Sequence, residues 1–267
     1  MTQSGKIMIR LATAWTIAAI AAGAVLGPPP ARAQTVDAAV ALAADVSRSI
    51  DENEFQLQRQ GYAAAINSKQ FLSVVASMPH GAVALCFIEW AGTADQTVVV
   101  DWTMIRDRDS AAAFAKRLVD APRSSSGRTA IGDGIDFAVK RLAAATFTTE
   151  RRIIDVSGDG TSNSGRPVSM ARDEAVENGI TINGLAIINE KTGGEFGTFI
   201  YAHTHPAGGL EHYYHDNVIG GAGAFVVQIV NFDAFAQAMT DKLVAEVSMR
   251  AAPSKRASLP MPGGESR

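Results

Sequence analysis

Five side chains in three short segments carry oxygen atoms of the kind that bind hard divalent cations: Asp45, Ser47, Ser49, Thr129 and Asp159. The first three alternate on one tight loop directly after an apolar run, residues 36–44. The threonine follows a Ser- and Gly-rich loop, residues 124–127, and the last aspartate precedes Gly160. Mg²⁺, Mn²⁺ and Ca²⁺ all accept carboxylate and hydroxyl oxygens. The pattern therefore predicts a divalent-cation site, with Mg²⁺ as the expected ion and Mn²⁺ or Ca²⁺ as chemically acceptable alternatives.

Each segment alone also has a simpler interpretation. The first loop can cap a helix, Thr129 can cap a helix that begins at Ala130, and Asp159 with Gly160 can form a turn. The two carboxylates, however, fall where predicted buried strands end, and the threonine lies on a loop that leads into a helix. Because ligands bind beyond the carboxyl ends of the strands in open α/β sheets, all three segments are expected at one edge. Their order and position favour a metal site.

Strand-like and helix-like segments alternate along the chain, which predicts an α/β fold with an open, mostly parallel sheet and helices on both faces. The expected strands are residues 36–44, 82–90, 96–102, 152–156, 180–188 and 225–230. The expected helices are a first one capped by Ser49 or Asp51 and reaching about Asn67, then residues 70–78, 109–119, 130–145, 168–177 and 232–247. A turn-forming segment, residues 91–95, predicts that the third strand is an antiparallel edge strand. A long irregular stretch is expected from Asn189 to about Gly223.

The order Asp-x-Ser-x-Ser, then a lone threonine, then Asp-Gly resembles the metal-ion-dependent adhesion site of von Willebrand factor A domains. Residues 213–225 resemble a segment of an uncharacterised bacterial family of exported von Willebrand factor A-like proteins. Together the likeness covers about residues 36–248. The resemblance implies a Rossmann-like open sheet and an exported protein.

The same resemblance implies roles for the five oxygen-bearing residues. Ser47 and Ser49 would bind the metal directly, and Thr129 would do so in the ligand-competent state. Asp45 and Asp159 would bind directly or through water. One coordination position is then left for water or for an Asp or Glu carboxylate of a protein partner.

The first 33 residues have the features of a signal peptide. Lys6 and Arg10 give a basic start, residues 11–26 form an apolar run, and Ala31-Arg32-Ala33 fits a cleavage signal. A retained membrane anchor is the alternative, and the proline cluster before the cleavage signal favours secretion. The expected location is therefore the bacterial periplasm or the exterior, with no membrane span after cleavage.

Cleavage would leave residues 34–249 as one von Willebrand factor A-like domain, with a mobile tail at residues 250–267. The leader contains three basic residues and no acidic one, so 21 of the 24 basic residues would remain against 27 acidic ones, and the formal charge would move from −3 to −6. A mildly acidic chain without a basic stripe argues against nucleic acid as a partner. The single cysteine, Cys86, lies in an apolar run and is expected to be a buried, inert thiol.

Four of the five histidines crowd into the irregular stretch: His203, His205, His212 and His215. Such a group could hold a second ion, for which zinc would be suitable, but a solvated loop with incidental histidines is the favoured interpretation. Asp155 is a charge within an apolar strand, and it is expected to pair with Arg151, Arg152 or a loop amide. No catalytic Ser/His/Asp set can be assigned from the sequence.

The leading functional hypothesis is an exported protein-binding module of the adhesion type that depends on a divalent metal. A metal-assisted hydrolase is one alternative, and it lacks a general base near the site other than the ligating carboxylates. A structural envelope protein whose metal site is unused is the other.

Overall fold

The computed structural model describes residues 33–188, 201–230 and 234–249. The strands are β1 (Ala38–Asp45), β2 (Val83–Trp90), β3 (Gln96–Ile105), β4 (Arg152–Gly158), β5 (Ile180–Ile188) and β6 (Val226–Val230). The helices are α1 (Glu52–Ile66), α2 (Lys69–Ser77), α3 (Arg108–Asp120), α4 (Ile131–Ala143), α5 (Val168–Glu177), α7 (Leu210–Tyr213), η1 (Tyr214–Val218) and α8 (Phe235–Ser248). The predicted tail and the predicted signal peptide, apart from Ala33, lie outside the described residues.

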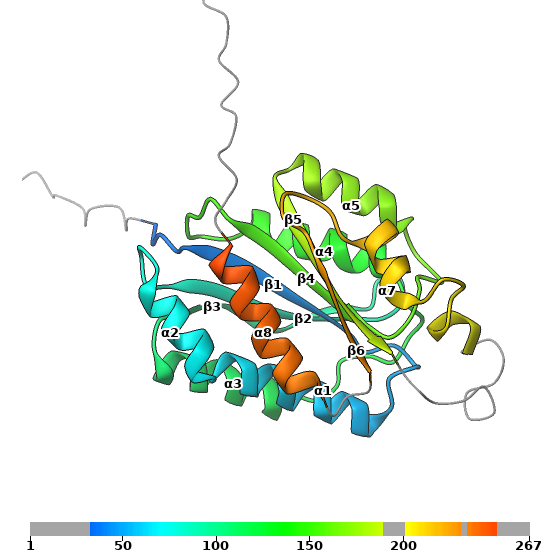
Figure 1. The fold of residues 1–267 in the computed structure, drawn as a ribbon, viewed down its shortest axis with the longest axis horizontal. Helices are drawn as coiled ribbons and strands as arrows, with labels where there is room; N and C mark the ends of the chain where they lie inside the picture. Colours follow the sequence, from blue (N-terminus) through cyan, green and yellow to red (C-terminus); the bar gives the residue numbers. More distant parts are fainter. Residues whose placement is uncertain (1–32, 189–200, 231–233, 250–267) are drawn as a thin grey trace, which may run out of the picture. The chain divides into compact units, whose positions relative to one another are not determined.

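The six strands form one sheet in the order β3-β2-β1-β4-β5-β6 (Figure 1). Strand β1 pairs in parallel with both β2 and β4, and β3 is the antiparallel edge strand. The predicted fold class is therefore confirmed. In the register of β1 and β4, Ala44 lies opposite Ser157, so the carboxyl ends of the two strands meet at the same edge of the sheet.

Helices cover both faces of the sheet (Figure 1). Val40 and Leu42 of β1 belong to a core shared with α1, α2, α3 and α8, whereas Ala39 and Ala41 belong to a second core shared with α4 and α5. Burial on both faces explains why β1 is a continuous apolar run rather than an alternating one. The Cys86 thiol is buried in the second core, as predicted, and burial raises its pKa to about 12.

Two helix starts show how local chemistry sets the boundaries. Asp51 caps α1 in a capping box with Glu54, which confirms one of the two expected caps. Helix α3 starts earlier than expected, because the Asp107 carboxylate accepts a hydrogen bond from the backbone N–H of Ser110, at 2.8 Å. The stretch expected to be irregular contains α7, η1 and a helical segment, residues 201–204.

The prediction for Asp155 was wrong. Its carboxylate lies 2.5 Å from Nζ of Lys242, which projects from α8 and also lies 2.5 Å from Glu246. Arg151 and Arg152 instead donate hydrogen bonds to backbone carbonyls. Asp155, Lys242 and Glu246 form a buried triad. Their side chains are fully buried, so each charge is stabilised by the other two and not by water.

The buried triad predicts a pH dependence of stability. Burial, and next the Asp155 carboxylate, raise the pKa of Glu246 to about 7, although Lys242 and Asn183 oppose the shift. An acid whose pKa is higher in the folded than in the unfolded protein binds its proton more tightly when folded. Its contribution to stability is therefore greatest at a pH below its pKa in the unfolded protein, and it is lost as the pH rises towards its pKa in the folded protein. Between pH 5 and 7 we expect the free energy of unfolding to fall by about 1–3 kcal/mol because of this group.

Urea unfolding at several pH values measures this slope. The Glu246→Gln variant keeps an oxygen for Lys242 and lacks the titrating proton, so its slope over this interval should be smaller than that of the wild type. An identical slope in both proteins would contradict the assignment to Glu246.

Candidate metal centre

The loop after β1 brings three of the predicted residues to one place. The Oδ1 atom of Asp45 accepts a hydrogen bond from the backbone N–H of Ser47, at 2.7 Å, which turns the chain at the end of the strand. The hydroxyl oxygens of Ser47 and Ser49 lie 3.1 Å apart. The backbone N–H of Ile50 closes the loop on the Ser47 carbonyl, at 3.1 Å. Because the two serines occupy alternate positions on this loop, their hydroxyl groups lie next to each other.

Asp159 joins this group from the neighbouring strand. It follows β4 directly, and the Ser49 hydroxyl donates to its Oδ1 atom, at 2.5 Å. Both Asp45 and Asp159 have no exposed surface. Four of the five predicted site residues are therefore linked by direct contacts at the carboxyl ends of β1 and β4.

The electrostatics of this group favour a cation. Burial, followed by the charge of Asp159, raises the pKa of Asp45 well above its ordinary value, although hydrogen bonds from Ser47 and the charge of Arg123 oppose this shift. Among the described residues, the Oδ2 atom of Asp45 has no hydrogen-bond partner although it is buried. A buried carboxylate oxygen without a partner costs free energy that a bound cation would recover. The chemistry of the donor set thus fits a hard divalent ion.

Arg123 supports the loop that follows β1, and no sequence pattern predicted that it would. Its guanidinium donates to the backbone carbonyls of Val46, Ser47 and Ile50, at 2.8, 2.9 and 2.8 Å. It also lies over the ring of Phe55, 5.3 Å from the centroid. No motif around position 123 indicates this role, because the contacts span more than 70 residues of sequence. Arg123 holds the shape of the loop that carries the two serines.

We expect Arg123→Ala to lower the affinity for Mg²⁺ by about 10- to 100-fold, as is typical when a supporting contact of a metal site is removed. The three carbonyls would lose their common donor, and the serine hydroxyls would no longer be held side by side. Calorimetric titration of Mg²⁺ measures the change. Arg117→Ala is the matched control, since this exposed arginine lies away from the loop, and equal affinities for both variants would argue against the role.

Thr129 reaches the same edge of the sheet by a different contact. Its side chain is 2% exposed, and its Oγ1 atom lies 3.0 Å from Nε2 of His203. In the described part of the chain, no hydrogen bond joins it directly to the two serines or the two aspartates. Helix α4 has no side-chain cap, so the interpretation of Thr129 as a helix cap was wrong. Asn163 fixes the backbone of Thr129 through two hydrogen bonds, at 3.0 and 2.9 Å.

The four clustered histidines have different environments. His203 is 8% exposed, and burial, with a smaller effect of Arg128, lowers its pKa to about 4, so the ring is neutral near pH 7. His205 stacks on Tyr201, with ring centroids 4.2 Å apart. The other two, His212 and His215, are largely exposed beside Asp216.

Within the described ranges, no three His, Cys, Asp or Glu side chains form a group that could hold a metal. The four histidines therefore do not form a second ion site of that kind. The interpretation of incidental, solvated histidines was wrong for His203, which is buried against site residues.

Two tyrosines of the stretch after β5 lie near the site. The Tyr213 hydroxyl accepts a hydrogen bond from the backbone N–H of Ser162, at 3.1 Å. Tyr214 is fully buried, and a Cβ atom added at Gly158 would lie 2.6 Å from its hydroxyl and 3.0 Å from Oδ2 of Asp45. A glycine is therefore required at position 158 for the ring to approach the carboxylate. All five predicted site residues are at most 3% exposed.

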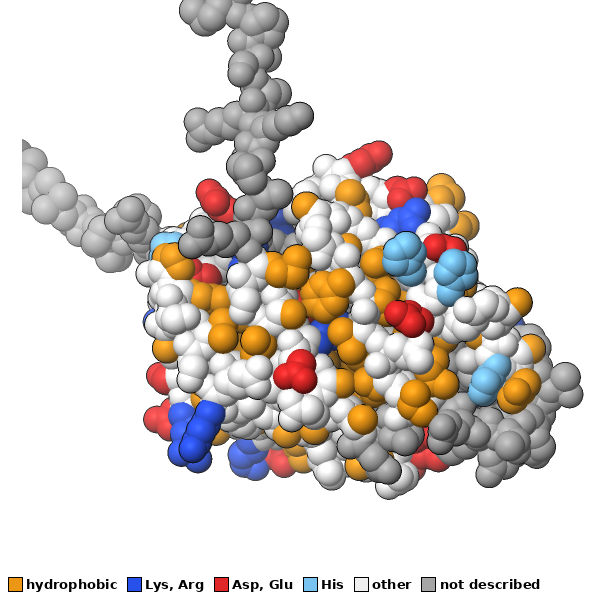
Figure 2. All heavy atoms as spheres, in the orientation of Figure 1, with side chains coloured by type: hydrophobic (Ala, Val, Ile, Leu, Met, Phe, Trp, Pro, Cys, Tyr) orange, Lys and Arg blue, Asp and Glu red, His pale blue; other side chains and the backbone are white. Residues whose placement is uncertain are grey.

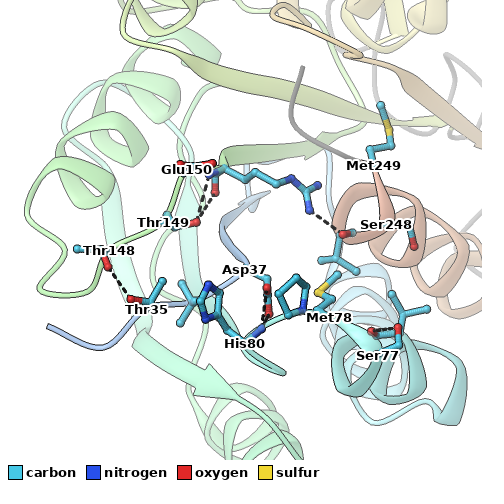
Figure 3. Close-up of a pocket in the computed structure, with 15 residues that line it drawn as sticks. Thr35, Asp37, Ser77, Met78, His80, Thr148, Thr149, Glu150, Ser248 and Met249 are labelled. Atoms are coloured by element: carbon cyan, nitrogen blue, oxygen red, sulfur yellow. Dashed lines mark hydrogen bonds between the residues drawn. The ribbon is translucent and has the colours of Figure 1, made fainter. Parts of the chain in front are cut away.

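A cavity of about 980 Å³ lies at the other end of the sheet, before the starts of β1 and β4 (Figure 3). Its carboxylate Asp37 accepts hydrogen bonds from the backbone N–H groups of His80 and Ala82. Among the described residues, none of the side chains that line it has a buried polar atom without a partner. The described lining of this cavity therefore offers no buried polar atom that a ligand would need to satisfy.

Two surface properties bear on partners. On the face drawn in Figure 2, lysine and arginine side chains are scattered rather than gathered into one stripe. None of the helices in the described ranges is long and apolar enough to cross a membrane.

Together, the strand order, the antiparallel edge strand and the helices on both faces are those of a von Willebrand factor A-like fold. Residues 35–251 match the family described as "Protein of unknown function (DUF1194)", and the chain belongs to that family. A comparison with curated proteins found no significant match.

Several solved structures share this fold. Proximal thread matrix protein 1 from the mussel byssus is 17% identical, with a TM-score of 0.53 over 80% of this chain and 47% of that chain. The pilus adhesin SpaC from Lactobacillus rhamnosus GG is 13% identical, with a TM-score of 0.57 over 80% of this chain and 31% of the adhesin. A von Willebrand factor type A protein from Catenulispora acidiphila is 15% identical, with a TM-score of 0.51 over 79% and 43%.

The chain thus spans less than half the length of each of these proteins. A second structure of the mussel protein is described as having a zinc-occupied metal-ion-dependent adhesion site; it is 16% identical, with a TM-score of 0.53. At such identities the likeness establishes the fold.

Proposed function

We propose that this protein is an exported binding module that engages a protein partner through a bound divalent cation. The ion is held by the five predicted residues, Asp45, Ser47, Ser49, Thr129 and Asp159. Mg²⁺ is the expected ion, and an Asp or Glu carboxylate of the partner completes its coordination. Residues 1–33 direct the protein to the periplasm or the exterior and are then removed.

The observation that carries this proposal is the pair of buried carboxylates beside two hydroxyls. Asp45 and Asp159 repel each other at fully buried positions, and the Oδ2 atom of Asp45 lacks a hydrogen-bond partner among the described residues. A dication placed there offsets both costs. Three of the five donors are neutral hydroxyls, so the ion keeps the ability to attract a further anionic ligand.

The similar structures support the binding role. One of them is a pilus adhesin, and another is a byssus matrix protein whose adhesion site has been found with zinc. Both carboxylates of the site are fully buried, so a partner's carboxylate reaches the ion only when the chain around the site rearranges.

Selection of phage-displayed peptides on the protein from Gln34 onward tests the proposal. With Mn²⁺ or Mg²⁺ present, we expect enriched peptides to contain an Asp or Glu and to be released by a chelator. The Asp159→Ala variant should enrich none of them. Peptides that lack an acidic residue, or that stay bound after chelation, would overturn the proposal.

Two results would favour the alternatives. Turnover of phosphoester or peptide substrates that is lost in Asp45→Ala would favour a metal-assisted hydrolase. A protein that gives no heat with Mg²⁺ or Mn²⁺ would favour a structural envelope protein with an unused site.

A further inference from the structure

Two glycines in neighbouring strands make room for the ring of Tyr214. A Cβ atom added at Gly158, the last residue of β4, would lie 2.6 Å from the Tyr214 hydroxyl. One added at Gly184 of β5 would lie 2.9 Å from Cδ1 of the same ring. Glycine inside a strand weakens the strand, and it often marks a place where another group approaches closely. The ring therefore occupies a slot that these two positions of the sheet leave open.

The slot brings the hydroxyl of Tyr214 close to the candidate metal centre. The position of the added Cβ atom at Gly158 lies 2.6 Å from this hydroxyl and 3.0 Å from Oδ2 of Asp45, so the two oxygens are near neighbours. Burial, followed by the charge of Asp45, raises the pKa of Tyr214 well above its ordinary value. The hydroxyl therefore keeps its proton near pH 7 and can donate a hydrogen bond.

The hydroxyl of Tyr214 costs stability that the packing of its ring does not require. It is buried, and among the described residues neither this hydroxyl nor Oδ2 of Asp45 has a hydrogen-bond partner. The hydroxyl of Tyr62, which is also fully buried, instead donates to Oγ of Ser157, at 2.9 Å. Because a buried hydroxyl without a partner is unfavourable, stability alone would favour phenylalanine at position 214.

The backbone at Tyr214 also has an unusual geometry. The tyrosine begins η1, which follows α7 directly, and its carbonyl accepts a hydrogen bond from the backbone N–H of Ile219, at 3.0 Å, across a wide turn of π-helix. Such turns are rare, and they occur frequently at functional sites. The turn and the two glycines together place this one ring beside a predicted ligand.

We propose that Tyr214 is a positioning residue of the metal centre, whose hydroxyl donates to Oδ2 of Asp45, directly or through one water, and orients this carboxylate for the ion. This inference rests on the proposed function. A carboxylate oxygen has two lone pairs, so Oδ2 can accept this hydrogen bond and still serve the ion or one of its waters. Hydrogen bonds to an ionised carboxylate are about twice as strong as those between neutral groups, and a bound ion keeps its ligands ionised. The hydroxyl therefore favours the metal-bound protein over the metal-free one.

The Tyr214→Phe variant tests this role, because it removes the hydroxyl and keeps the ring. Titration calorimetry should show that the affinity for Mg²⁺ and Mn²⁺ falls by about 10-fold or more, the usual effect of losing a hydrogen bond that orients a metal ligand. Urea unfolding with chelator should show a midpoint equal to or higher than that of the wild type, since a buried hydroxyl without a partner has been removed. A purely structural tyrosine would lose affinity and metal-free stability together.

The matched control is Tyr62→Phe. This ring is also fully buried, but it belongs to the core on the other face of the sheet, and its hydroxyl has a partner in Ser157. The substitution should lower the midpoint of unfolding with chelator and leave the affinity for Mg²⁺ within a few-fold. The two substitutions are thus expected to act in opposite ways on stability and on metal binding.

A direct readout is the nuclear magnetic resonance signal of the tyrosine Cζ atom, which responds to hydrogen bonding of the hydroxyl. In protein with ¹³Cζ-labelled tyrosine, the signal that is missing from Tyr214→Phe should shift when Mg²⁺ is added, and the signal of Tyr62 should not. A Tyr214 signal that Mg²⁺ leaves in place, equal affinities of Tyr214→Phe and the wild type, or a lower metal-free midpoint would overturn the role of Tyr214 alone. A wild-type protein that gives no heat with either ion would instead overturn the proposed function, and this inference with it.

Discussion

Replacing Asp45 by asparagine is expected to stabilise the metal-free protein and to weaken its binding of Mg²⁺ by about 100-fold or more. In the absence of an ion, the buried charge repels Asp159 and its Oδ2 atom lacks a hydrogen-bond partner among the described residues. Asparagine removes the charge and keeps the oxygen that accepts the hydrogen bond from Ser47. The gain should be about 1–3 kcal/mol in the free energy of unfolding, the usual cost of such a buried group.

Urea unfolding with chelator and with excess Mg²⁺ measures both effects. The wild type should be the less stable protein with chelator and the more stable one with Mg²⁺, because binding to the folded state adds stability. Asp109→Asn is the control, since this exposed carboxylate lies away from the site, and its effect should be the same in both conditions. A metal-free Asp45→Asn protein that is less stable than the wild type would contradict the electrostatic account of the site.

Replacing Lys242 by alanine is expected to destabilise the fold by about 3–5 kcal/mol, as is typical when one partner of a buried ion pair is removed. The ammonium lies 2.5 Å from both Asp155 and Glu246, and all three side chains are fully buried. Without it, two carboxylates would remain in the core with no countercharge from α8. The midpoint of urea unfolding reports this loss.

The matched control is Lys116→Ala. Lys116 pairs with Asp120 at the same distance, 2.5 Å, and in the same i,i+4 arrangement as Lys242 and Glu246, but its side chain is 76% exposed. Its removal should cost at most about 0.5 kcal/mol, because water screens an exposed pair. Equal effects of the two substitutions would show that the buried triad does not stabilise the fold.

Local patterns were sufficient to predict the framework and to bring four oxygen-bearing residues to one place, Asp45, Ser47, Ser49 and Asp159. An apolar run that stops at Asp45 is what a strand buried on both faces looks like in sequence, and β1 ends at this residue. Asp51 with Glu54 is a local capping signal, and the structure confirms it. The hydroxyls of Ser47 and Ser49 lie 3.1 Å apart because two residues at this spacing on a tight loop place their side chains next to each other.

The contacts that the sequence did not reveal are those between distant segments. Arg123 supports a loop more than 70 residues away, His203 contacts Thr129 across 74 residues, and Lys242 reaches Asp155 from the last helix. A single arginine, histidine or lysine carries no periodic pattern that would indicate its partner. Such pairings follow from how the helices pack on the sheet, which only the folded chain defines.

An X-ray anomalous difference map of Mn²⁺-loaded crystals of the protein from Gln34 onward would locate the bound ion. We expect one strong peak in contact with the hydroxyls of Ser47 and Ser49, with the carboxylates of Asp45 and Asp159 around it. A map with no peak at the carboxyl ends of β1 and β4, or with its strongest peak beside His212 and His215, would contradict this expectation.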